Sequence, residues 1–202
     1  MEYMIQPLVN LDDRSLALVA LLHQSVMHNL LNDLGLPIIL RYYQIAKSDP
    51  SVIGFCVISS SSPEILGWVI GSPTPYAINA RIQRPLPWFL KQMFGLVISR
   101  PPVFLQMLFS VFHSSQQRPA PHTIELTYIG VASQAQGSGI GRTLLNAFTE
   151  ASRSFGYCSI ELTTEIDNFH ALALYEKSGF TVKRTFKEGR FERYRMEKKL
   201  SI

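Results

Sequence analysis

A strand-like run that ends in a glycine turn and restarts as a helix is the part of this sequence best suited to chemistry. It extends from Glu125 to Arg142, carries glycines at positions 137, 139 and 141, and leads into a helix-like run at 143–154. The first N–H groups of a helix have no intrahelical partner, and the helix dipole places partial positive charge at the same end. Glycines let a ligand approach the backbone closely because no Cβ intervenes. The pattern therefore predicts an anion site, for which a pyrophosphate is the usual guest.

The spacing of the glycines distinguishes between kinds of phosphate site. A Walker A loop requires a lysine after its last glycine, but Arg142 stands there. A dinucleotide fingerprint requires a third glycine at that same position, although Glu161 does lie about 20 residues further on, where a ribose-binding acid would be. The spacing that remains is Gln136-x-x-Gly139-x-Gly141. A glycine turn that merely joins a strand to a helix is the alternative.

A second motif follows about thirty residues later in the chain. Residues 168–180 read NFHALALYEKSGF, close to the pattern N-x-x-A-x-x-[FLY]-Y-[ER]-[KR]-x-G-F. Together, and in this order, the two motifs resemble the cofactor-binding motifs of the GNAT superfamily of N-acetyltransferases. The resemblance is strong over residues 122–186, rests on topology alone over the first seventy residues, and hardly extends to 73–121.

The resemblance implies that acetyl-coenzyme A is the co-substrate. It would lie where the strand ending near Val131 diverges from the strand beginning near Tyr157, with the glycine loop on its pyrophosphate. Asn168 would orient the pantetheine arm, although asparagine is also an ordinary helix N-cap. The cofactor-binding residues expected on this basis are Ile129, Val131, Gln136, Gly137, Ser138, Gly139, Ile140, Gly141, Arg142 and Asn168.

Two residues are the expected catalytic groups. Tyr175 follows Asn168 by two helical turns, and the resemblance places its hydroxyl near the coenzyme sulfur as general acid; the alternative is a core tyrosine on an amphipathic helix. Glu125 matches the glutamate that some members use as base, and strand alternation would put it on one face with Ile129 and Val131. The alternative for Glu125 is a glutamate that pairs with a cation. His23, His28, His122 and His170 are weaker candidates or have no assigned role.

The elements around these motifs predict one α/β (α+β) domain spanning residues 1–202, a GNAT fold with a mixed, twisted sheet flanked by helices. Strands are expected at 3–9, 52–59, 65–71, 123–131, 157–163, 181–186 and 191–199, and helices at 12–30, 38–46, 141–155 and 168–177. An apolar insertion at 73–121 would separate the third and fourth strands. Its core, 86–112, contains two apolar runs divided by Arg100-Pro101-Pro102, each too short to span a bilayer. We expect helices there that pack beside the acceptor; a homodimer surface or a lipid-facing patch is the alternative.

Composition limits the remaining choices. A 202-residue chain with 47% hydrophobic and 17% charged residues can bury a sizeable core, and a net charge of +4 would suit an anionic ligand. No block of Lys and Arg suggests nucleic acid, no Cys/His cluster suggests a metal, and both cysteines are expected to be buried thiols. The N-terminus lacks a signal-peptide pattern, so a cytoplasmic location and no membrane association are expected.

The predicted activity is direct transfer of an acetyl group from acetyl-coenzyme A to a primary amine on a small molecule or peptide. No cysteine or serine is placed as an activated nucleophile, so no covalent enzyme intermediate is expected. The alternative is an acyl-coenzyme A-binding sensor or assembly module of the same fold without turnover. The identity of the amine is not encoded in these motifs, because a fold does not fix a substrate.

Overall fold

The computed structural model describes residues 2–27, 29–99, 120–188 and 191–201, and all statements about structure concern these residues. They form a mixed seven-stranded sheet in the order β1-β2-β3-β4-β5-β7-β6, in which β4 and β5 are parallel and all other neighbours are antiparallel. The strands are β1 Tyr3–Pro7, β2 Ile53–Ser59, β3 Ile65–Ser72, β4 Thr123–Val131, β5 Ser159–Glu165, β6 Thr181–Glu188 and β7 Phe191–Lys199. The predicted fold class is confirmed, with strand boundaries within two residues of those expected.

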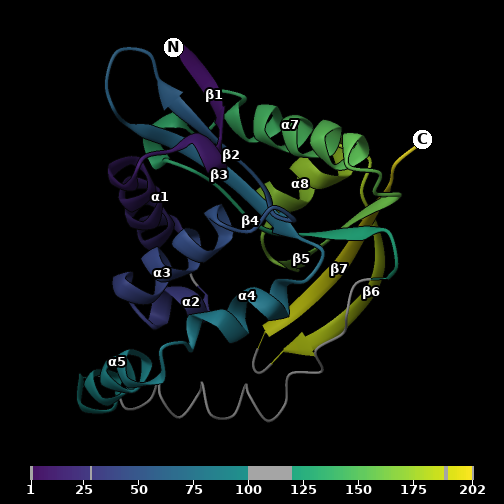
Figure 1. The fold of residues 1–202 in the computed structure, drawn as a ribbon. Helices are drawn as coiled ribbons and strands as arrows, with labels where there is room; N and C mark the ends of the chain where they lie inside the picture. Colours follow the sequence, from purple (N-terminus) through teal and green to yellow (C-terminus); the bar gives the residue numbers. More distant parts are fainter. Residues whose placement is uncertain (1, 28, 100–119, 189–190, 202) are drawn as a thin grey trace.

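Helices cover both faces of the sheet (Figure 1). The helices are α1 Asp13–Val26, α2 Leu30–Asp33, α3 Leu36–Lys47, α4 Pro75–Ile82, α5 Leu86–Ser99, α7 Ile140–Ser154 and α8 Phe169–Lys177, with short 3₁₀ turns at Leu8–Asn10 and Ser133–Ala135. Helices α1 and α3 pack on one face around Trp68 and Ile70, which we call the α1/α3 core. Helices α7 and α8 pack on the other around Val69 and Leu126, which we call the α7/α8 core.

Local sequence explains where the first of these helices begins and how α7 is seated. The carboxylate of Asp12 accepts a hydrogen bond from the Ser15 N–H at 2.7 Å, so α1 starts at a well-formed N-cap. Helix α7 rests closely on β3 because Gly67 has no side chain: a Cβ there would lie 3.0 Å from Leu144 and 3.1 Å from Ile140. This contact fixes the first turn of α7 against the centre of the sheet.

A β-bulge in β4 changes which residues share a face. Leu126 pairs with Gly71 and Tyr128 pairs with Ile70, so Thr127 is the extra residue between them. Leu126, Ile129 and Val131 therefore pack in or against the α7/α8 core, whereas Tyr128 packs against the α1/α3 core. Glu125 lies on the opposite face from Leu126. The prediction that Glu125 shares a face with Ile129 and Val131 is wrong, because the bulge interrupts the alternation.

Strands β4 and β5 separate at the same bulge. Their parallel pairing runs from Thr123↔Ser159 to Leu126↔Leu162, and among the described residues it continues no further. β4 goes on to Val131 beside β3, while β5 goes on to Glu165 beside β7. The divergence expected between these two strands is therefore present.

The described part of the insertion is helical, as predicted for 86–99. In α5, Met93 is buried in the α1/α3 core and Trp88 and Phe89 pack against it, whereas Leu86, Leu90 and Phe94 are exposed. The second apolar run, 103–112, lies outside the described residues. In the part of the chain that the structure covers, no helix is long and apolar enough to cross a membrane. The position of the insertion beside the acceptor stays a prediction.

His23 is a core residue rather than an exposed polar group. It is fully buried, its Nδ1 lies 2.8 Å from the Tyr43 hydroxyl, and its ring contacts those of Trp68 and Tyr128 at centroid distances of 5.6 and 4.8 Å. Burial lowers the pKa of His23 from 6.5 to about 4. His28, the neighbouring candidate, lies outside the described residues.

Protonation of His23 should destabilise the fold in acid. Between pH 6.5 and 4 the unfolded chain binds a proton at this histidine that the native state does not, so the free energy of unfolding falls as the pH falls through that window. We expect His23 to account for a loss of about 2 kcal/mol between pH 7.5 and pH 5. Urea unfolding at the two pH values should show this loss in the wild type and not in His23→Gln. The matched control is His170→Gln, a substitution of an exposed histidine, which should keep the wild-type pH dependence; an equal loss in His23→Gln would contradict the assignment.

Candidate active site

The glycine loop connects the end of β4 to the start of α7 in an open conformation. Gly137 and Gly139 have φ angles of 77° and 87°, in the left-handed region that favours glycine, and a Cβ at either would meet no atom within 4 Å. The loop is held from within by the Gln136 amide, which donates to the Val131 carbonyl at 3.3 Å, and by the Ser138 hydroxyl, which donates to the Ala135 carbonyl at 2.5 Å. The space beside these two glycines is therefore open and large enough for a ligand to approach the backbone.

The N-terminus of α7 is directed at this loop with its donors available. The first intrahelical bond runs from the Thr143 N–H to the Gly139 carbonyl at 3.0 Å, so the N–H groups of residues 140–142 precede it. No side chain among the described residues caps the helix, and no acidic residue stands in its first turn. Arg142 is exposed beside it. Free N–H groups, the helix dipole and a nearby guanidinium together fit a phosphate group.

The start of α7, the end of β4 and helix α8 converge at Gly141. A Cβ there would lie 3.4 Å from Leu174 and 3.7 Å from Val131. Ile129 and Val131, half-buried, line the same side through their packing against the α7/α8 core. The structure therefore brings the expected residues from Ile129 to Arg142 together at the end of β4 that has left β5.

Helix α8 places its two expected site residues differently. Asn168 is exposed, and its side-chain oxygen accepts from the Ala171 N–H at 3.2 Å, so it caps the helix as the alternative interpretation foresaw; its amide group is not used in this contact. Tyr175 is 6% exposed in the α7/α8 core, with its ring 5.8 Å from that of Phe180. Burial raises the pKa of Tyr175, so its hydroxyl keeps its proton throughout the neutral range.

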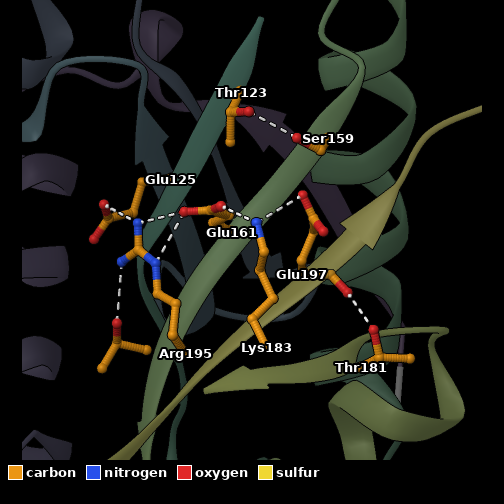
Figure 2. Close-up of polar contacts among 9 residues, drawn as sticks. Thr123, Glu125, Ser159, Glu161, Thr181, Lys183, Arg195 and Glu197 are labelled. Carbon is orange, nitrogen blue, oxygen red and sulfur yellow. Dashed lines mark hydrogen bonds and ion pairs between the residues drawn. The ribbon is translucent and has the colours of Figure 1, made fainter. Parts of the chain in front are cut away.

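Glu125 lies in a network of charged side chains on the other face of the sheet. Its Oε2 accepts from Nη2 of Arg195 at 3.0 Å, and the same nitrogen donates to Oε2 of Glu161 at 2.7 Å. Figure 2 shows Arg195 reaching between the two carboxylates, and Lys183 on the far side of Glu161. The cation-pairing alternative for Glu125 is thus realised. The contact with Arg195 does not test whether Glu125 acts as a base, and that role stays a prediction.

Glu161 and Arg195 are the residues whose role the sequence did not reveal. The spacing of Glu161 suggested a ribose-binding acid, but its carboxylate is engaged by Lys183 at 3.0 Å and by Arg195. Burial alone would raise the pKa of Glu161, but the hydrogen bonds and charges of Lys183 and Arg195 outweigh it and lower the pKa. The alternation of charged and apolar residues in β7 could have indicated that Arg195 and Glu197 share a face, but not which residues they meet.

The remaining candidates lie apart from this arrangement. His122 is exposed at φ 59°, and its carbonyl accepts from the Cys158 N–H at 2.8 Å. Cys158 is exposed, so the prediction that both cysteines are buried is wrong for it; it stands in the turn before β5 rather than within the strand. Cys56 is buried as predicted, and burial raises the pKa of its thiol to about 12. Among the described residues no group of His, Cys, Asp and Glu could hold a metal ion.

Comparison with known proteins assigns the chain to a family. A profile described as the Acetyltransferase (GNAT) family matches residues 23–180. The chain belongs to the GNAT family. Both motifs identified from the sequence fall within the matched range.

Curated relatives and solved structures agree with this membership. The mycothiol acetyltransferase of Jonesia denitrificans is 29% identical over 149 residues, which is 73% of this chain and 46% of that protein. This GNAT chain therefore spans less than half the length of that relative. Among solved structures, a GCN5-related N-acetyltransferase from Kribbella flavida superposes with a TM-score of 0.64 at 15% identity, covering 98% of each chain. The ribosomal-protein-S18-alanine N-acetyltransferase of Escherichia coli gives 0.61 at 14% identity, covering 100% of this chain and 96% of that one. At these identities the superpositions show the fold alone.

Proposed function

We propose that this chain transfers the acetyl group of acetyl-coenzyme A to the primary amine of an acceptor. The observation that carries the proposal is the open glycine loop at the uncapped start of α7, placed beside the end of β4 that no longer pairs with β5. Membership of an acetyltransferase family supports the acyl donor. A structural neighbour with a TM-score of 0.60 at 15% identity, covering 100% of each chain, is described as the NatC complex bound to Gag peptide and CoA.

The binding residues divide by the part of the donor that they would hold. The backbone of residues 137–142 offers N–H groups to a pyrophosphate, and Arg142 adds positive charge. The backbone of β4 from Ile129 to Val131 lies beside the loop, paired with β3 on one edge and without a β5 partner on the other. The polar groups on the unpaired edge, apart from the Val131 carbonyl that Gln136 engages, could bind the amide groups of a pantetheine arm. Asn168 contributes its remaining amide group from the start of α8.

The transfer requires that a proton leave the amine and that another reach the sulfur. The amine nitrogen forms a bond to the thioester carbon, the carbon–sulfur bond breaks, and coenzyme A leaves as its thiol. Glu125 takes the ammonium proton, and Tyr175 supplies a proton to the thiolate. The nitrogen releases its second proton as the amide forms, and this proton restores the Tyr175 hydroxyl. The buried, protonated hydroxyl of Tyr175 and the partly exposed carboxylate of Glu125, 21% accessible, suit these two roles.

The acceptor is a small molecule or a peptide that presents a primary amine. The relatives' names cover both kinds, since one is a mycothiol acetyltransferase and a structural neighbour acts on a ribosomal-protein alanine. The exposed Leu86, Leu90 and Phe94 recur every four residues on α5 and form one apolar stripe. This stripe favours an acceptor with an apolar portion, and membrane association is not part of the proposal.

An acceptor screen tests the function. Purified protein is incubated with acetyl-coenzyme A and a panel of small amines, amino sugars and peptides with free N-termini, and the free thiol of coenzyme A is measured. We expect thiol release that depends on at least one amine and exceeds the rate without acceptor. If the protein binds acetyl-coenzyme A but none of the amines on the panel causes it to release thiol, it would instead be a binding module without turnover.

A further inference from the structure

Three glutamates stand side by side on neighbouring strands of the sheet. Glu125 of β4 is in register with Glu161 of β5, which is in register with Glu197 of β7. Strands lie about 4.8 Å apart, so like charges in such a row repel one another. One rung away, the hydroxyls of Thr123 and Ser159 lie 2.7 Å apart on the same face (Figure 2). The row therefore requires compensation from other elements.

Two cations fill the spaces between the three carboxylates. Arg195 lies between Glu125 and Glu161, and Lys183 of β6 lies between Glu161 and Glu197 at 3.0 and 3.2 Å. Figure 2 shows this order across the sheet, carboxylate and cation in alternation. Three carboxylates and two cations leave one formal negative charge in the row.

Arg195 divides its hydrogen bonds unequally. Nε and Nη2 both donate to Glu161 Oε2, at 3.0 and 2.7 Å, and Nη1 donates to the Thr163 hydroxyl at 3.1 Å. Glu125 receives one hydrogen bond from the guanidinium, from the second N–H of Nη2, at 3.0 Å. Glu161 also has Lys183, so it is the firmly held carboxylate of the row. Glu125 is held by a single donor at the end of the row, where β4 parts from β5.

We propose that Arg195 is a positioning residue for Glu125 and that Glu161 competes with Glu125 for the same guanidinium. This inference rests on the proposed function, in which Glu125 accepts the proton of the amine. Arg195 fixes the direction of the Glu125 carboxylate through Nη2. Glu161 binds the same guanidinium through two shorter or equal hydrogen bonds, so it weakens the hold of Arg195 on Glu125.

The other charged and titratable groups around Glu125 leave this competition in place. Lys183 and Glu197 lie on the far side of Glu161, and Tyr42 of α3 is the titratable residue that faces Glu125 from the helical layer. Burial raises the pKa of Tyr42, which is therefore neutral wherever carboxylates titrate. Among the described residues, the cation that contacts Glu125 is Arg195, and Glu161 shares it.

The competition predicts opposite effects for two substitutions, each of which removes one charge. Protein labelled with ¹³C at the glutamate carboxyl carbons is titrated by NMR, and the Glu125 signal is assigned by its loss in Glu125→Gln. Arg195→Gln should raise the Glu125 titration midpoint by about 1 unit or more, and Glu161→Gln should lower it. Arg195→Lys keeps the positive charge but loses the several N–H groups of the guanidinium. Its Glu125 midpoint should therefore lie between those of Arg195→Gln and the wild type. Glu165→Gln removes a carboxylate of β5 that pairs with Arg193 rather than Arg195, and should leave the midpoint unchanged.

This measurement needs no acceptor, so its failure is distinct from failure of the acceptor screen. Midpoints that stay in place, or move the same way in Arg195→Gln and Glu161→Gln, would overturn the proposal whatever the screen shows. With the amine that releases thiol fastest in the screen, the acidic limb of kcat/KM should move in the same directions as the midpoints. If Arg195→Gln does not fold, Arg195→Lys takes its place. Its Glu125 midpoint should rise while that of Glu161→Gln falls, and this contrast tests the proposal.

Discussion

Gly139→Asp should abolish binding of acetyl-coenzyme A while leaving the protein folded. At a ligand concentration one hundred times the Kd, binding stabilises a native protein by about 2.7 kcal/mol, or roughly 5–10 °C in Tm for a chain of this size. The aspartate would put a side chain and a negative charge into the space beside the first N–H groups of α7, where nothing now lies within 4 Å. A side chain at the positive φ of residue 139 is strained, but an acidic residue at the start of a helix is favourable and offsets part of that strain, so the unliganded variant should remain folded.

Gly156→Asp is the matched control at the other end of the same helix. Gly156 also has a positive φ, 81°, and also has no atom within 4 Å of a Cβ position, so the strain and the space are equivalent. Differential scanning fluorimetry should show the full acetyl-coenzyme A shift in Gly156→Asp and none in Gly139→Asp. A full shift in Gly139→Asp would remove the glycine loop from the binding site.

Tyr175→Phe should lower turnover by about 10²- to 10⁴-fold, the usual contribution of one general acid. The ring that packs in the α7/α8 core is retained, so the free energy of unfolding and the affinity for acetyl-coenzyme A should hardly change. The measurement is kcat from thiol release with the amine identified in the acceptor screen, alongside the thermal shift with acetyl-coenzyme A.

Tyr157→Phe provides the comparison, since Tyr157 packs against the same core and burial likewise raises its pKa. We expect wild-type turnover in this variant. Wild-type turnover in Tyr175→Phe as well would mean that water or another group protonates the leaving thiolate, and Tyr175 would then be a core residue only.

The loop and the helices could be predicted from the sequence because they depend on neighbours in the chain. The positive φ angles of Gly137 and Gly139, the cap at Asp12 and the apolar spacing of α7 are all set within a few residues. The same is true of the two motifs, whose order sufficed to predict the fold. These features are local, and local geometry is encoded in local sequence.

The surroundings of Glu125 were decided only by the tertiary structure. No residue near Thr127 predicts the bulge, because the bulge exists only in the pairing of β4 with β3. The bulge places Glu125 on the opposite face of the sheet from Ile129 and Val131. Arg195 reaches Glu125 across 70 residues of sequence, so no spacing rule could join them. The burial of His23 and the exposure of Cys158 likewise follow from what packs against them. The sequence by itself determined the glycine turn at the start of α7, which a few neighbouring residues can build, whereas the surroundings of Glu125 required several strands brought together by folding.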